Sequence, residues 1–250
     1  MARDASHMDN LRFSTNEVAG RLEEPELELV VAATRNENIL WLKSDLRKWR
    51  KTIYVVDDID ANPKIPRNKG REAMVYLTCV SPRILINPKS RLALALKTYA
   101  SSYIIDRYET LPPNVIFHHG ERFQWHNDDP DHDTLPLLQR FRIPYLQEQG
   151  YVNLRCVWAP GCPVEILPAE DAKSGPKKHV PQAHLYSKAF AELFPERDLP
   201  AEVGVPCCSQ FGVTRATITA RPRKDYIRFR EWLLNTELDD ANSGRVFDNL

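Results

Sequence analysis

The feature that most constrains the fold is a strand–helix–strand pattern near the start of the chain. Leu27–Ala33 is a short run rich in β-branched residues that predicts a buried strand, and Ile53–Val56 predicts a second one. Between them, Ile39, Leu42 and Leu46 recur at three- and four-residue spacing, which predicts an amphipathic helix. Strand, helix and strand within about 30 residues form a βαβ unit, whose two strands run parallel.

Further elements alternate along the rest of the chain. A helix is expected from near Arg71, and Val115–Phe117 predicts a third strand. The later segments predict a helix over 135–141, a strand over 151–158, a helix near 185–193, strand and turn over 211–220, and a last helix over 226–233. We therefore expect a flexible leader, residues 1–25, and one α/β domain, residues 26–250, with a mostly parallel sheet and helices on both faces.

Residues 79–102 interrupt one of the predicted helices. Tyr76 lies on an apolar helical face that Cys79–Pro82 breaks. If residues 79–102 are removed, Thr78 joins Tyr103 and the apolar face continues without a phase error. The segment is either a surface insertion or translated intron sequence, and we favour the second interpretation.

The amino-acid composition limits which binding partners and which cell compartment are expected. Lys plus Arg and Asp plus Glu both number 34 in 250 residues, so the formal net charge is zero. This balance disfavours a protein that nucleic acid holds mainly through a global positive field. The chain has no apolar run of membrane-spanning length and no secretory signal, and its five cysteines are sparse. We expect a soluble cytoplasmic protein with reduced cysteines and no membrane contact.

Acidic residues follow the second predicted strand. Asp57, Asp58 and Asp60 come directly after it, where the carboxyl ends of parallel strands commonly bind ligands. Spaced carboxylates there could hold a divalent cation through their oxygen atoms. The alternative is an acidic turn that caps a helix or faces water.

Histidines follow the third predicted strand in the same way. The imidazole of His118 or His119 could act as an acid, a base or a hydrogen-bond donor. A buried, structurally hydrogen-bonded histidine is the equal alternative. Downstream, His126–Asp133 is rich in Asp and His, but its spacing matches no closed zinc site, and we interpret it as a polar loop. We expect Cys207 and Cys208 to be small core residues.

Asp106 and Glu109 lie near the end of the interrupted helix. At i and i+3 they share a helix face, so their carboxylates can converge on one cationic group, or one can serve as a general base. The alternative is a solvated helix end.

Several stretches of the chain together form a recognisable pattern: Val30–Glu37, Tyr54–Asp58, Asn68–Ala73, Leu111–Gly120, Gly150–Arg155, Trp158–Pro163, Gln210-Phe211 and Ser243–Val246. They resemble a fungal family long catalogued as a domain of unknown function, which includes the arginine-containing cyclodipeptide synthases. The resemblance runs from about Leu27 to the end of the chain and is interrupted only by residues 79–102.

The resemblance implies an activity and a site. Members of this family join arginine to a second amino acid, drawing on aminoacyl-tRNA, and close a diketopiperazine, a secondary metabolite. Their essential Asp-x-x-Glu signature matches Asp106 and Glu109, and we add His118 as an acid or base. No metal and no cofactor are expected, and the sequence implies no particular protein partner. The expected substrate contacts are Thr34, Arg35, Asn36, Asp57, Asp58 and His119, and the expected tRNA contacts are Arg47, Lys48, Arg50, Lys51, Arg221, Arg223 and Lys224.

The arrangement also resembles the glycosyltransferase-A fold, in which the strand after the glycine-rich helix ends in Asp-x-Asp and binds manganese. Here that strand ends in His118-His119-Gly120, which removes the carboxylates of that metal clamp. The alternative function is therefore a glycosyltransferase-like enzyme, or an inactive descendant that binds a nucleotide or a carbohydrate.

Overall fold

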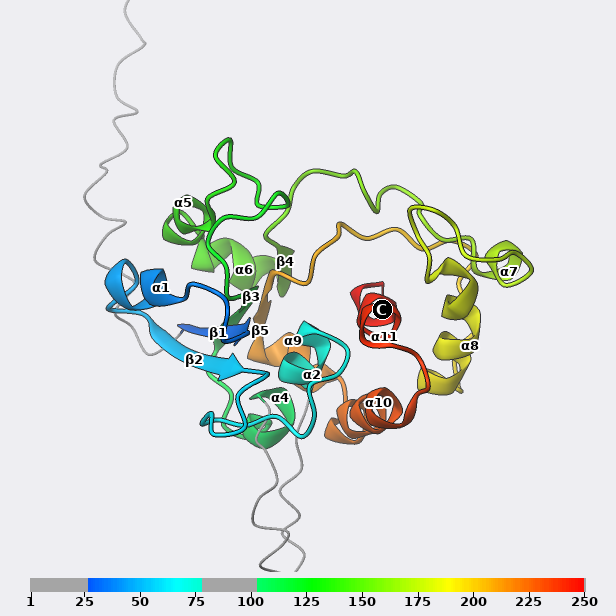
Figure 1. Ribbon diagram of the computed structural model, residues 1–250, viewed down its shortest axis with the longest axis horizontal. Helices are drawn as coiled ribbons and strands as arrows, with labels where there is room; N and C mark the ends of the chain where they lie inside the picture. The colour runs from blue at the N-terminus through cyan, green and yellow to red at the C-terminus, as the bar shows by residue number, and fades with distance from the viewer. Residues whose placement is uncertain (1–26, 78–102, 250) are drawn as a thin grey trace, which may run out of the picture.

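A computed structural model describes residues 27–77 and 103–249 of the chain (Figure 1). The leader predicted for residues 1–25 and the insertion predicted for residues 79–102 lie outside the described residues. Two helices, α2 (Glu72–Leu77) and α4 (Tyr103–Arg107), flank the second of these segments and pack against each other.

The described strands form one mixed sheet in the order β2-β1-β3-β5-β4. Its strands are β1 (Leu27–Ala33), β2 (Arg50–Val55), β3 (Asn114–His119), β4 (Tyr151–Asn153) and β5 (Phe211–Thr214). β1 lies between β2 and β3 and runs parallel to both, so the βαβ prediction is confirmed. β5 runs antiparallel to both β3 and β4, so a mostly parallel sheet is not confirmed. Apolar periodicity identifies a strand but carries no information on its direction.

Side chains of β1 alternate between two hydrophobic cores. Val30 and Ala32 pack on one face with residues of α2, α4 and α9 (Arg215–Ala220). Leu29 and Val31 pack on the other face with α1 (Leu40–Ser44), α5 (Thr134–Gln139) and α6 (Ile143–Gln149). The predicted α/β fold with helices on both faces is therefore observed.

Three local boundaries differ from the sequence prediction. α1 ends at Ser44, although the apolar face continues through buried Leu46. β4 ends at Asn153, whose side-chain oxygen accepts a hydrogen bond from the Arg155 backbone at 2.7 Å and turns the chain. After β5 the chain forms α9 instead of a turn, because Thr214 Oγ1 caps the helix by accepting from Thr217 N.

The C-terminal part of the chain adds a group of helices, the last two of which contact α2 (Figure 1). They are α7 (Pro168–Asp171), α8 (Ala183–Leu193), α10 (Arg223–Asn235) and α11 (Asp240–Asp248). α8, α10 and α11 share a core that includes Leu193, Phe229 and Val246. α11 is an element that the sequence analysis missed. No helix in the described part of the chain is long and apolar enough to cross a membrane.

Candidate functional site

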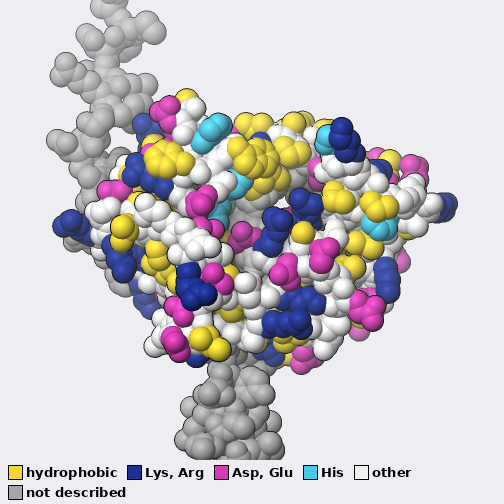
Figure 2. Space-filling model, in the orientation of Figure 1, with side chains coloured by type: hydrophobic (Ala, Val, Ile, Leu, Met, Phe, Trp, Pro, Cys, Tyr) yellow, Lys and Arg dark blue, Asp and Glu magenta, His cyan; other side chains and the backbone are white. Residues whose placement is uncertain are grey.

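A cavity of about 530 Å³ opens where the carboxyl ends of β1 and β3 face α11. Figure 2 shows acidic, basic and histidine side chains gathered near the centre of this face. Its lining includes residues from the turn after β1 (Glu37), the start of α2 (Arg71, Glu72), the end of β3 (His119), the loops (Trp125, His126, Glu165, Gln182, Cys207, Cys208, Ser209) and α11 (Arg245, Asp248, Asn249).

Carboxylates outnumber guanidinium groups in the described wall of the cavity. Burial raises the pKa of Glu37 above its ordinary value, and the nearby carboxylates of Glu121 and Glu72 raise it further. Burial likewise raises the pKa of Asp248 to about 6, although a hydrogen bond from Ser209 opposes the shift. Glu37, Glu72, Glu165 and Asp248 face the cavity with only Arg71 and Arg245 as Arg or Lys partners among the described lining residues. Such a wall favours a cationic ligand.

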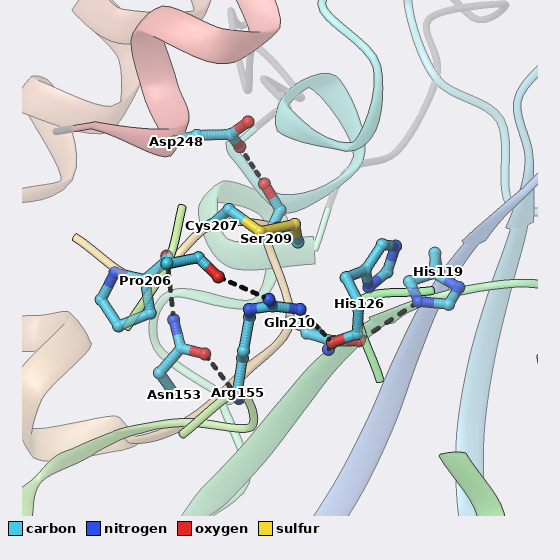
Figure 3. The surroundings of a disulfide bond; sticks show 11 residues. His119, His126, Asn153, Arg155, Pro206, Cys207, Ser209, Gln210 and Asp248 are labelled. Atoms are coloured by element: carbon cyan, nitrogen blue, oxygen red, sulfur yellow. Dashed lines mark hydrogen bonds between the residues drawn. A yellow bond between two sulfur atoms is a disulfide. The ribbon is translucent and has the colours of Figure 1, made fainter. Parts of the chain in front are cut away.

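Two neutral histidines stand at the sheet end of the cavity. Burial lowers the pKa of His119 to about 2 and that of His126 to about 4. Buried Gln210 fixes the proton of His119: its amide nitrogen donates to His126 O at 3.4 Å, so its oxygen accepts from His119 Nε2 at 3.2 Å (Figure 3). The rings of His119 and His126 are perpendicular, with centroids 4.8 Å apart.

Three polar atoms of the cavity wall are buried without a hydrogen-bond partner among the described residues. They are His126 Nδ1, Gln182 Oε1 and Asn249 Oδ1. Gln182 and Asn249 are only 5% and 6% exposed. Because buried polar groups are almost always hydrogen-bonded in native proteins, these atoms are positioned to bind water or a polar ligand in the cavity.

A disulfide bond between the adjacent residues Cys207 and Cys208 forms part of the wall (Figure 3). The prediction that these are reduced core residues is wrong, since both are partly exposed to the cavity and joined to each other. Cys156 and Cys162 are free thiols. Apart from the adjacency of the two residues, no sequence feature indicated this bond.

Of the two predicted histidines, His119 lines the cavity and His118 is packed away from it. His118 is 1% exposed, its Nε2 pairs with Thr134 Oγ1 at 2.8 Å, and its Nδ1 contacts His119 O at 2.7 Å. Burial lowers the pKa of His118 to about 4. His118 is therefore a buried, structurally hydrogen-bonded histidine, and any acid or base in the cavity must be another residue.

The polar residues after β1 and β2 form hydrogen bonds and an ion pair with one another. Arg35 N donates to Asp57 Oδ1 at 2.8 Å, and the Arg35 guanidinium lies 3.8 Å from the same carboxylate. Asp58 accepts from Asp60 N at 2.9 Å, so the alternative of an acidic turn is observed. The described cavity lining does not include these residues, nor the neighbouring Thr34 and Asn36. No group of His, Cys, Asp and Glu among the described residues could hold a metal ion.

Glu37 is the lining residue of this turn that the sequence analysis passed over. Its carboxylate accepts from Thr34 N at 2.9 Å and faces the cavity. Its position three residues after Thr34, at the carboxyl end of a parallel strand, was the available signal.

Asp106 and Glu109 are exposed at the opposite edge of the sheet from the cavity. Between them, Arg107 donates to both carboxylate oxygens of Glu28, near the start of β1, at 3.0 and 2.8 Å. The length of β3 separates this edge from His119, roughly 17 Å at about 3.3 Å per residue. The structure therefore does not bring the pair together with the cavity.

The predicted tRNA contacts gather around α4 and the start of β2. Several of them also hold the fold: Arg50 pairs with Glu28 at 2.8 Å, and Arg223 donates to Ile105 O at 3.0 Å. The other internal contacts join Lys51 to the carbonyls of Leu46 and Trp49, Arg47 to Ser44 O, and Arg221 to the rings of Phe194 and Phe229. Lys48 and Lys224 are exposed. None of the seven belongs to the described cavity lining.

Comparison with known proteins identifies a family. The model of the family described as "Protein of unknown function (DUF3431)" matches residues 29–82 and 95–250. The unmatched residues between these stretches fall inside the predicted insertion. No curated protein and no solved structure matches the chain. Since the family model covers most of the sequence, the chain belongs to the DUF3431 family.

Proposed function

We propose that the chain is an aminoacyl-tRNA-dependent cyclodipeptide synthase and that the cavity holds its arginyl group. The observation that supports the proposal is the excess of carboxylates over guanidinium groups in the cavity wall, which includes Glu37, Glu72 and Asp248. A guanidinium and an α-ammonium are the two cations of an arginyl ester, and carboxylates bind both through charge-assisted hydrogen bonds. A volume of about 530 Å³ lies within the range of ~300–1,000 Å³ that is typical of small-molecule sites.

The proposed reaction requires a base, but it requires no ATP. An aminoacyl-tRNA ester is already activated, so the α-amine of one aminoacyl group can attack the carbonyl carbon of the other once its ammonium has lost a proton. The C–N bond forms, the ester C–O bond breaks, and the tRNA leaves with its ribose hydroxyl. A second aminolysis closes the ring.

Asp248 is our candidate for the base. Its pKa of about 6 lies closer to neutral pH than that of an ordinary aspartate, which improves proton acceptance while keeping most of the group ionised at pH 7. Neutral His126, whose buried Nδ1 has no partner among the described residues, is our candidate for stabilising the oxyanion of the tetrahedral intermediate.

The family resemblance assigns Asp106 and Glu109 an essential role, and the proposal retains it as an independent prediction. The pair is too far from the cavity to share its ligand. It lies instead on the side of α4, where the cations Arg107 and Arg223 also lie. This position predicts that Asp106 and Glu109 contribute to turnover but do not bind the arginyl group.

The second candidate is a glycosyltransferase-like enzyme with a glycosyltransferase-A-like fold. The cavity adjoins the carboxyl ends of β1 and β3, where open α/β sheets commonly bind nucleotides. Trp125, which is 59% exposed and also lines the cavity, offers a flat apolar surface for a base or a sugar ring.

The test is product formation from purified components. The protein is incubated with arginyl-tRNA and a mixture of other aminoacyl-tRNAs, and cyclic arginine-containing dipeptides are detected by mass spectrometry. We expect product that disappears after RNase digestion and in Asp248→Asn. Asp240→Asn, on the exposed start of the same helix, is the matched control. Product that persists after RNase would exclude tRNA dependence, and transfer that requires a UDP-sugar and manganese would favour the second candidate.

A further inference from the structure

The Cys207–Cys208 disulfide sits at the centre of a short segment that is fixed on both sides. Before it, Pro206 O accepts a hydrogen bond from Asn153 Nδ2 at 3.4 Å. After it, the Ser209 hydroxyl donates to Asp248 of α11 (Figure 3). Gln210 then joins the two cavity histidines through its amide, as described above. The sulfur atoms therefore lie among the groups that shape the cavity.

The backbone at the disulfide adopts a conformation that side chains disfavour. Cys208 has a φ of 78°, in the left-handed region that residues with a Cβ atom rarely occupy. The covalent ring between neighbouring cysteines restricts the peptide that joins them, and opening the ring would allow Cys208 to return to an ordinary φ. That rotation would move Ser209, the next residue, relative to Asp248.

Both sulfur-bearing residues are reachable. Cys207 and Cys208 are partly exposed and line the cavity, so a small thiol can approach through its mouth. The free thiols of Cys156 and Cys162 belong to a different loop and are not joined to the pair.

We propose that the Cys207–Cys208 bond is a reversible redox site that controls the shape and polarity of the cavity. Two molecules of a low-molecular-weight thiol supply two electrons and two protons, the S–S bond breaks, and two cysteine thiols and one small-molecule disulfide result. Reduction releases the backbone of Cys208, separates Ser209 from Asp248, and leaves that carboxylate without its hydroxyl donor. This inference does not depend on the proposed reaction.

The redox state is read first by peptide mapping. Protein purified without reductant is alkylated with N-ethylmaleimide, before and after equilibration with reduced glutathione. We expect Cys156 to be alkylated in both samples, and Cys207 and Cys208 only after reduction. After reduction, phenylarsine oxide, which bridges two close thiols, should bind the pair. Alkylation of Cys207 and Cys208 as free thiols after equilibration with oxidised glutathione would overturn the proposal.

The consequence for the cavity is read by hydrogen exchange in the absence of substrate. Loss of the contact between Ser209 and Asp248 should make amide exchange in Asp240–Asp248 about tenfold faster in reduced than in oxidised wild-type protein. The double variant C207S/C208S should exchange at the fast rate in both buffers, whereas C156S should respond as the wild type does. Equal exchange of α11 in oxidised and reduced wild type would overturn the proposal, whether or not the protein makes a cyclic dipeptide.

Discussion

Arg107 Nη1 lies 2.8 Å from Glu28 Oε2, and this ion pair joins α4 to β1 at the edge of the sheet opposite the cavity. Glu28 is 1% exposed and also accepts from Arg50 at 2.8 Å and from Thr52 Oγ1 at 2.6 Å. A buried carboxylate depends on such partners, because removing one leaves part of its charge uncompensated.

Arg107→Met should therefore destabilise the fold. The change keeps an unbranched side chain but removes the charge and the guanidinium that lies over the Tyr103 ring, and we expect the free energy of unfolding to fall by about 2 kcal/mol. Urea denaturation measures it, with the exposed Arg47→Met as the control. If both variants unfold at the same urea concentration, the pair contributes nothing to stability.

Asp248 should make stability depend on pH. Its folded-state pKa of about 6 lies above its ordinary value of 3.8, so the folded state binds this proton more tightly than the unfolded state does. The stability it contributes is therefore fully present below pH ~4 and lost as the pH rises through ~6. Between those limits, wild type should lose on the order of 2 kcal/mol relative to Asp248→Asn. Urea denaturation of both proteins at each pH measures this difference. A difference in unfolding free energy that stays the same at every pH would contradict the raised pKa.

Asp106→Asn and Glu109→Gln should separate turnover from arginine binding. The resemblance predicts that each reduces product formation by about a hundredfold or more. Their position at the α4 edge predicts that affinity for L-arginine methyl ester, measured by calorimetry, stays unchanged. Glu37→Gln, in the cavity wall, should weaken that affinity. Normal turnover in both α4 variants would remove the role that the resemblance assigns to the pair.

His118→Leu should lower stability rather than change the chemistry directly. The substitution leaves the buried hydroxyl of Thr134 without its 2.8 Å partner, which costs about 1–3 kcal/mol. We expect a lower melting temperature, with product formation per folded molecule close to that of the wild type at low temperature. A large loss of turnover in a fully folded His118→Leu protein would restore His118 as a catalytic residue.

The central strands could be predicted from sequence because their signal is local. Leu27–Ala33 is apolar except for Glu28 and is buried on both faces, and the observed β1 has the same bounds. The carboxyl end of β3 was likewise identified as a site, and His119 lines the cavity there.

Much of the cavity could not be predicted, because its walls come from distant parts of the chain. His119 meets Gln210 across 91 residues, and Ser209 meets Asp248 across 39. Local periodicity contains no information about such pairs. α11 was missed since Asp240–Asp248 is mostly polar, and its stability comes from the Asp239 cap and from buried Val246.

The close contact between two glycines has a practical consequence for handling the protein. A Cβ atom on Gly244 would lie 3.0 Å from Gly70 O, so a side chain there would force α11 and the start of α2 to shift slightly apart. The close contact places Arg245 and Asp248 in the cavity wall, within the last six residues of the sequence. A purification tag fused directly after α11 would therefore begin beside the cavity, whereas β1 begins at the opposite end of the sheet, because its carboxyl end faces the cavity.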